Sequence, residues 1–213
     1  MIKLILVRHG YSTSNASGTY TGQLNAPLNE VGRAQAAQLA DYLCTHERID
    51  AVYASDLSRA AETVRPTADR LGLPLVTLPA LRELDVGAWT GVSYAEVRER
   101  YAADFTAYTQ NIDAPCTGGE SIRTASARLL ACIKEIAQKE AGKTVLLCSH
   151  ALCSRLCAAL AATGRVEDVT AQKAPANASF CIYEYESGRF KPLVRDFTAH
   201  LDNATSTSPK GLV

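Results

Sequence analysis

Two histidines, two arginines and a glutamate stand close behind apolar stretches of this 213-residue sequence. Arg8 and His9 directly follow one such stretch, and Arg59 lies a few residues behind a second. Glu83 lies in a loop, and His150 follows a later stretch. Imidazole can attack phosphorus, arginine binds phosphate oxygens through its planar fork, and a carboxylic acid can protonate a leaving oxygen. These residue types predict transfer of a phosphoryl group.

The pattern of apolar and polar residues predicts the elements that position these side chains. Strands are expected at 2–7, 51–54, 75–78 and 143–148, with a hairpin formed by 180–185 and 192–197. Helices are expected from Asn29 to about 44, over 57–71, over 121–140, and from His150 to Gly164. This alternation predicts an α/β fold, a three-layer sandwich whose mostly parallel sheet carries helices on both faces. Sites in such sheets form beyond the carboxyl ends of the strands, where the five residues would converge.

The domain organisation follows from the same pattern. We expect a single domain over residues 1–203. Residues 92–118, one or two short helices and a loop, would form an inserted lid. Residues 11–27 predict a long loop, and long ordered loops are often functional. Residues 204–213 are polar and are expected to fray.

Composition excludes several function classes. Twenty-two basic and 22 acidic residues balance, without the basic excess of a nucleic-acid binder. No stretch predicts a membrane span or signal peptide, and seven scattered cysteines without a CxxC pair indicate reduced thiols, so we expect a cytoplasmic protein. Helical spacing would allow zinc at His150, Cys153 and Cys157, but no fourth ligand is evident. The oligomeric state stays open, with a homodimer among the alternatives.

Six segments carry a resemblance to a known family. They are LVRHGYSTSN, YTGQLNAPLNEVGRAQA, YASDLSRAAETVRP, LRELDVGAWTG, TGGES and LLCSHALCSRL, in that order between residue 4 and about residue 156. They resemble the histidine phosphatase superfamily, which includes the cofactor-dependent phosphoglycerate mutases. The resemblance implies a phosphoglycerate mutase-like fold. One Arg-His-Gly triplet would be weak evidence, whereas six segments in order make coincidence a poor explanation.

The resemblance also implies roles for the candidate catalytic residues. His9 would be the phosphorylated nucleophile. Arg8, Arg59 and His150 would hold the phosphoryl oxygens. Glu83 would act as general acid and then as general base. No metal or other cofactor would be needed.

A second group of residues would bind the substrate. Asn15 stands where the family often places a phosphate contact, and Thr21, Gly22 and Gln23 match a segment that lines the substrate pocket. For Asn15 and Gln23 turn chemistry is an equal alternative. Ala151 replaces a glycine that is common after the second histidine, although its backbone N–H could still face the phosphate.

A purely structural role is the alternative for catalytic candidates such as Arg59 and Glu83. Arg59 could pair with Asp56 or Glu62 on its own helix. Glu83 could act as a cap or pair with Arg82.

Three functions compete for this set of residues. The first is a histidine acid phosphatase-type phosphoric monoester hydrolase, a phosphomonoesterase acting on a small phosphorylated metabolite through a phosphohistidine. The alternative is phosphoryl transfer of the phosphoglycerate mutase type, which must hold a polyanion throughout the cycle. The third is a non-catalytic phosphate-binding module. Residues 92–118 carry two arginines against four carboxylates and are rich in aromatic residues, which favours the phosphatase.

Overall fold

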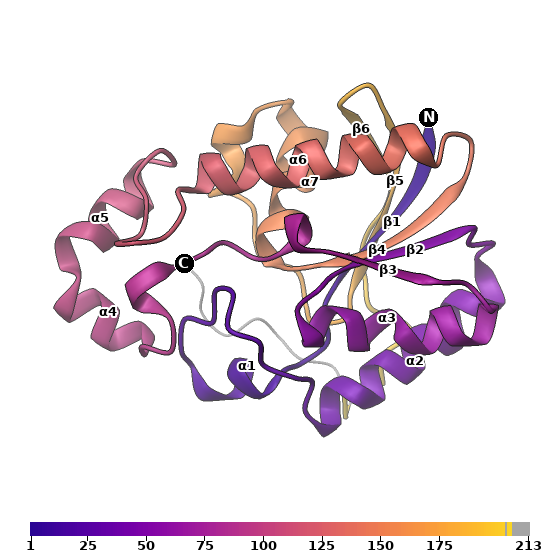
Figure 1. Cartoon of the computed structure of the whole chain (residues 1–213), viewed down its shortest axis with the longest axis horizontal. Helices are drawn as coiled ribbons and strands as arrows, with labels where there is room; N and C mark the ends of the chain where they lie inside the picture. The colour runs from indigo at the N-terminus through magenta and orange to yellow at the C-terminus, as the bar shows by residue number, and fades with distance from the viewer. Residues whose placement is uncertain (203, 206–213) are drawn as a thin grey trace.

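A computed structural model describes residues 1–202 and 204–205 and shows a six-stranded sheet (Figure 1). The strands are β1 (Ile2–Arg8), β2 (Ala51–Ser55), β3 (Leu75–Leu78), β4 (Thr144–Ser149), β5 (Phe180–Glu186) and β6 (Arg189–Phe197). They are ordered β3-β2-β4-β1-β5-β6. The first four run parallel and the β5–β6 hairpin is antiparallel, which confirms the predicted mostly parallel sheet.

Two pairs of helices cover the two faces of the sheet, which confirms the three-layer sandwich. The pairs are α2 (Glu30–His46) with α3 (Ser58–Leu71), and α6 (Ile122–Lys139) with α7 (Ala151–Thr163). In Figure 1 α6 and α7 lie above the sheet, and α2 and α3 lie below it. Successive side chains of β1 point to opposite faces of the sheet and so contribute to both cores. Leu4 and Leu6 belong to the core under α6 and α7, whereas Ile5 and Val7 belong to the core under α2 and α3.

A short helix, α1 (Thr13–Ser17), lies inside the stretch that the sequence predicts as loop only. Ser12 and Asn15 form a capping box, in which the Ser12 side chain accepts from the Asn15 N–H and the Asn15 side chain accepts from the Ser12 N–H. One turn of helix is too short to show periodicity, so its caps were the only available sequence signal. The remaining short elements are the 3₁₀ turns η1 (Pro79–Leu81), η2 (Gly87–Trp89) and η3 (Val166–Val169).

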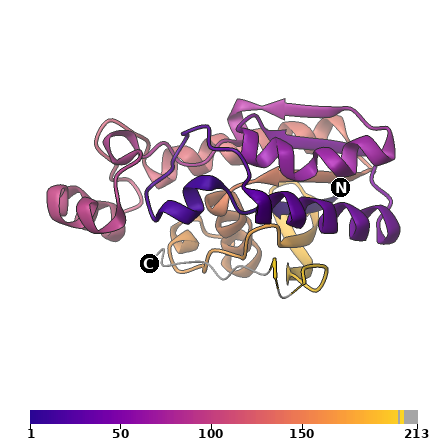
Figure 2. The ribbon, with the colours of Figure 1, turned by 90° about the horizontal axis from the view of Figure 1, so that it is seen from below.

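Residues 92–118 contain two helices, α4 (Tyr94–Arg100) and α5 (Ala102–Gln110). Figure 2 shows them extending from one end of the sandwich. Trp89 is fully buried at their base and contacts the rings of Tyr20, Phe105 and Tyr108. This aromatic cluster joins the excursion to the loops at the carboxyl end of the sheet.

At the other end of the sequence, Thr205 is buried, and its hydroxyl bonds to Gln38 and Asp202. Residues 206–213, most of the tail that is expected to fray, lie outside the described residues. Within the described part of the chain, no helix has the length and apolar character needed to cross a membrane.

Candidate active site

His9 and His150 are neighbours because β1 and β4 are neighbours. The two strands pair in parallel with Arg8 opposite Ser149, so the next residue of each chain segment emerges at the same edge. The His9 N–H donates to the Ser149 carbonyl over 3.0 Å, and the two imidazole centroids lie 5.1 Å apart at 60°. The register of the sheet therefore sets the separation of the two rings.

The His9 ring is held in its neutral form. Its Nδ1 lies 2.8 Å from the Gly10 carbonyl oxygen, which can only accept, so the hydrogen is assigned to Nδ1 and the lone pair to Nε2. Burial lowers the pKa of His9 well below 6.5, and the charges of Arg59 and Arg8 lower it further. An uncharged Nε2 beside two cations is suited to attack a phosphate ester.

His150 is the residue that precedes α7, and its ring is fully buried. Neither ring nitrogen has a hydrogen-bond partner within the described residues. Burial first, and then Arg59 and His9, lower its pKa well below 6.5. Unpaired buried donors are rare in folded proteins, so this ring indicates a place where an acceptor belongs.

The two arginines are buried against the same histidines. Arg59 is 1% exposed and donates to the carbonyls of Leu24 and Gly22 over 2.7 and 2.9 Å. Burial lowers its pKa to about 10, although the charge of Glu83 opposes this shift. Arg8 donates through Nη1 to the Pro175 carbonyl, and its buried Nε has no partner among the residues described.

Glu83 reaches the site from a loop. Its carboxylate accepts from the N–H of Ala151 over 3.0 Å and, over longer distances, from the N–H of Leu152, at the start of α7. These contacts hold the end of the Glu83 side chain at the N-terminus of α7. The Ala151 N–H, for which the sequence predicts a phosphate contact, is thus directed at Glu83.

A cavity of about 110 Å³ joins most of the predicted site residues. Eight of the ten line it: Arg8, His9, Asn15, Thr21, Gly22, Arg59, Glu83 and Ala151. The other two do not. The His150 ring lies beside the His9 ring, and Gln23 bonds to the main chain of Glu83.

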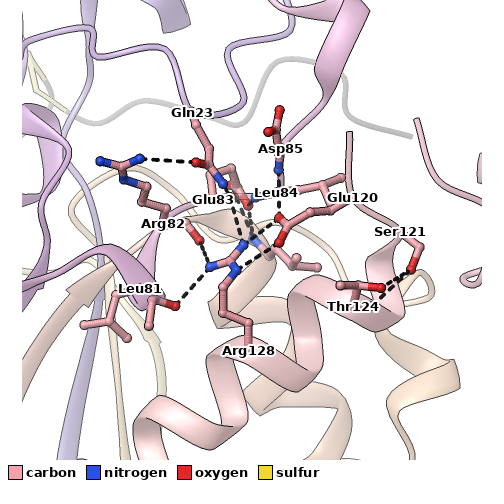
Figure 3. A network of polar contacts seen from close by, with 12 residues as sticks. Gln23, Leu81, Arg82, Glu83, Leu84, Asp85, Glu120, Ser121, Thr124 and Arg128 are labelled. Atoms are coloured by element: carbon pink, nitrogen blue, oxygen red, sulfur yellow. Dashed lines mark hydrogen bonds and ion pairs between the residues drawn. The ribbon is translucent and has the colours of Figure 1, made fainter. Parts of the chain in front are cut away.

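Gln23 belongs to a polar network instead of the cavity wall (Figure 3). Its Nε2 donates to the Glu83 carbonyl over 3.2 Å, and its Oε1 accepts from Arg82 over 3.5 Å. Arg82 in turn pairs with Asp56, which lowers the pKa of that carboxyl chiefly through their hydrogen bond. The alternative pairings proposed for Arg59 with Asp56 and for Glu83 with Arg82 are therefore not the ones formed.

Asn15 is oriented by a residue that the sequence did not single out, Asn177. The Asn15 Oδ1 accepts from the Ser12 backbone N–H, the Ser12 hydroxyl and Asn177 Nδ2. Three donors on Oδ1 leave the Asn15 amide N–H groups for the cavity that this residue lines. Asn177 also donates to the His9 carbonyl over 3.0 Å.

Three tyrosines and a further arginine were also missed as cavity residues: Tyr20, Tyr94, Tyr108 and Arg155. The sequence favours packing for Tyr94, and only the fold places it in the wall of the cavity. Burial raises the pKa of Tyr20 to about 12 and also raises that of Tyr94. These phenols therefore stay neutral and supply apolar rings with hydroxyl groups.

The predicted thiols and the zinc alternative can also be placed. All seven cysteines are free, and six of them are buried. Across residues 1–202 and 204–205, no group of three or more His, Cys, Asp or Glu side chains is arranged to hold a metal ion.

Comparison with known proteins adds to this geometry. A model of the histidine phosphatase superfamily (branch 1) matches residues 4–196. The chain is 37% identical over 152 residues to a metal-independent phosphoserine phosphatase of Arabidopsis thaliana, covering 70% of this chain and 63% of that protein. It is 34% identical over 151 residues to phosphoserine phosphatase 1 of Hydrogenobacter thermophilus, covering 70% and 71%. The match to the Arabidopsis protein thus spans less than two thirds of its length.

A solved structure resembles the whole sandwich. The mycobacterial glucosyl-3-phosphoglycerate phosphatase in complex with VO3 superposes with a TM-score of 0.83 at 26% identity, covering 92% of this chain and 99% of that one. The likeness therefore extends beyond residue 156, where the last of the six motifs ends.

Proposed function

The chain belongs to the histidine phosphatase superfamily, and on that premise we propose that it is a phosphomonoesterase that hydrolyses a small phosphorylated metabolite through a phosphohistidine on His9. The relatives named above are phosphatases of small phosphate esters, which supports this reaction class.

One observation carries the proposal. Next to the nucleophilic ring, the Arg8 Nε and both His150 ring nitrogens are buried without a hydrogen-bond partner in the described chain. Leaving a buried donor unpaired costs about 1–3 kcal/mol, and more for a charged group. A phosphoryl group supplies several acceptor oxygens and negative charge at once. It would accept from the Arg8 Nε–H and from the one N–H that a neutral His150 ring carries, and it would be held against His9.

The proposed cycle uses His9 to carry the phosphoryl group and Glu83 to give and take the proton. The Nε2 lone pair of His9 attacks phosphorus, the bond from phosphorus to the ester oxygen breaks, and protonated Glu83 gives its proton to that oxygen. Glu83 then takes a proton from water as the water oxygen attacks phosphorus. The phosphorus–nitrogen bond breaks, inorganic phosphate leaves, and both residues return to their starting states.

The wall of the cavity favours hydrolysis over the mutase alternative. A mutase must retain a substrate with a second anionic group, which requires cations beside the reacting phosphate. The two arginines of the 92–118 excursion are engaged elsewhere, since Arg98 stacks on Phe105 and Arg100 pairs with Glu96. Arg155, a further cation of the cavity wall, donates to the carbonyls of Val169 and Thr170. The excursion instead contributes Tyr94 and Tyr108 to the cavity. We propose that it acts as a lid over the leaving group.

The cellular compartment of the enzyme and its type of partner are also proposals. Seven free cysteines suit a reducing compartment, and the balanced charge gives no support to nucleic-acid binding. We therefore propose a cytoplasmic enzyme acting on a soluble small molecule.

Rapid quenching tests the nucleophile. Wild-type protein mixed with a phosphate ester radiolabelled in its phosphoryl group should carry acid-labile, base-stable label. His9→Ala should carry none and should turn over no substrate. His46→Ala changes an exposed histidine far from the cavity and should retain the label. Label on a serine or cysteine would refute the assignment.

Substrate class is tested by a panel of phosphomonoesters assayed beside phosphoglycerate mutase activity. Hydrolysis of several small esters with release of inorganic phosphate is expected. Efficient transfer between the hydroxyl groups of phosphoglycerate, with little phosphate released, would favour the mutase.

A further inference from the structure

Glu83 lies in a segment without helix or strand, between the 3₁₀ turns η1 and η2. Its carboxylate must nevertheless be held beside the His9 ring if it is to protonate a leaving oxygen. Loops usually lack the rigidity that such positioning needs. Something other than regular secondary structure must therefore hold this main chain in place.

Arg128, on α6, points toward this segment and bonds to it (Figure 3), and it does not line the cavity. It donates through Nη1 to the carbonyls of Ala80 and Arg82 over 3.0 Å each, and through Nη2 to the carbonyl of Glu83 over 3.3 Å. Its Nε and Nη2 also donate to the two carboxylate oxygens of Glu120 over 3.0 and 2.7 Å. All five N–H groups of the guanidinium are thus used.

Glu120 fixes the next part of the same segment. One of its carboxylate oxygens accepts from the Asp85 N–H over 3.0 Å, and its own N–H donates to the Asp85 carbonyl over 2.8 Å. Arg128 and Glu120 together therefore bond to the main chain on both sides of Glu83. Neither lines the cavity.

A glycine allows this close approach. A Cβ placed on Gly119 would lie 2.3 Å from the Asp85 carbonyl oxygen, which no side chain can tolerate. The TGGES segment thus packs its backbone directly against the segment that carries Glu83. The pairing is built into the fold and is not a chance surface contact.

We propose that Arg128, supported by Glu120, is a positioning residue for Glu83 in the hydrolysis proposed above, so this inference rests on that function. Arg128 does not touch the substrate. It holds the Glu83 main chain so that the carboxyl group reaches the leaving oxygen. Lysine keeps the charge but has only three donors on one nitrogen, and it cannot span three carbonyls and a carboxylate.

Leaving-group dependence separates positioning from general stability. A poor leaving group, such as an alkyl alcohol, needs a proton, whereas p-nitrophenolate barely does. Misplacement by about 1 Å can cost about 100-fold, so Arg128→Lys should slow the single-turnover burst with an alkyl phosphate by about 10- to 100-fold. The burst with p-nitrophenyl phosphate should fall by less than about threefold. Glu120→Gln should show the same selectivity with a smaller effect, and it supplies the test if Arg128→Lys does not fold.

Arg123→Lys is the matched control. Arg123 lies on the same helix and also bonds two carboxylates, those of Asp113 and Glu167, but within the described residues its side chain makes no hydrogen bond to the Glu83 segment. The substitution should leave the ratio of the two burst rates unchanged. A changed ratio in this variant would overturn the proposal, because the ratio would then respond to any lost arginine pair on α6.

A double-mutant cycle with Glu83→Gln completes the test. Arg128→Lys should add little to the alkyl-phosphate defect of Glu83→Gln, because the group that it positions is already disabled. Suppose that Glu83→Gln selectively lowers the burst rate with alkyl phosphates, and that adding Arg128→Lys lowers this rate by as much again as it does in the wild type. The positioning role is then overturned while the proposed function stands. If Glu83→Gln shows no selectivity, the acid role of Glu83 falls, and this inference falls with it. An equal loss for both leaving groups in Arg128→Lys and in Glu120→Gln would mean that the pair only stabilises the fold.

Discussion

Mild acid should destabilise this protein through its two active-site histidines. Burial, Arg59 and the other cations of the site lower the pKa of His9 and of His150 well below the 6.5 expected in the unfolded chain. Below pH 6.5 the unfolded state therefore binds protons that the folded state does not. The stabilisation is present above pH 6.5 and is lost as the pH falls toward the folded-state pKa.

The magnitude follows from linkage. For a histidine that stays neutral in the fold, lowering the pH from 6.5 to 5.5 reduces the free energy of unfolding by about 1 kcal/mol. His9 and His150 together should thus cost about 2 kcal/mol over this range. Burial also lowers the pKa of His200, so this residue adds a further loss in the same direction.

Urea unfolding at pH 7.5, 6.5 and 5.5 in a phosphate-free buffer measures this loss. His150→Asn and His9→Asn should each reduce the difference between pH 6.5 and pH 5.5 by about 1 kcal/mol, whatever they do to stability at neutral pH. His46→Asn, at an exposed position, is the control and should change it little. The reasoning would be refuted by wild-type stability that does not change over this range, or by an undiminished loss in both active-site variants.

Three further predictions address the chemistry and its supports. Activity should survive EDTA, because Arg8, Arg59 and His150 supply the positive charge and donors that a phosphoryl group needs; loss with chelator and recovery with Mg²⁺ or Zn²⁺ would overturn this mechanism. Glu83→Gln should slow phosphorylation by alkyl phosphates on the order of 10²–10⁴-fold, with a much smaller effect for p-nitrophenyl phosphate in a single-turnover burst. Asn177→Ala should lower the free energy of unfolding by about 1–3 kcal/mol and weaken inhibition by inorganic phosphate. Asn177→Asp should lower the free energy of unfolding further, because its carboxylate would face three acceptors. If Asn177→Asp is as stable as the wild type, the Asn177 side-chain amide has been assigned the wrong way round.

The sequence predicts the sheet edge well because the relevant signals are local. Apolar stretches end at Arg8 and at His150, and parallel strands bring such ends together. The antiparallel hairpin was also predictable, from Ser187 and Gly188 between two strand-like stretches. The burial that keeps the histidines neutral followed from the same strands.

Residues that support the site from a distance could not be predicted in this way. Arg128 stands in a helix where an arginine usually indicates a solvated face, and its partners are backbone carbonyls that leave no sequence pattern. Asn177 lies in a turn after a stretch without periodicity, and only the β1–β5 pairing brings it under His9. Gln23 matched a pocket motif, but its side chain donates to the Glu83 carbonyl instead of lining the cavity. The sequence could not separate these two roles, because a glutamine side chain suits either.

The pairing of β1 with β4 has a consequence for how new specificities can arise. The histidines are held by a ladder of backbone hydrogen bonds, whereas the part of the cavity wall that we propose meets the leaving group includes residues 19–22 and, from the 92–118 excursion, Tyr94 and Tyr108. Exchanging that excursion for one of another sequence would leave the strand register untouched. Reaction and recognition are therefore separable modules, and a library confined to the excursion could explore new metabolites without rebuilding the chemistry beneath it.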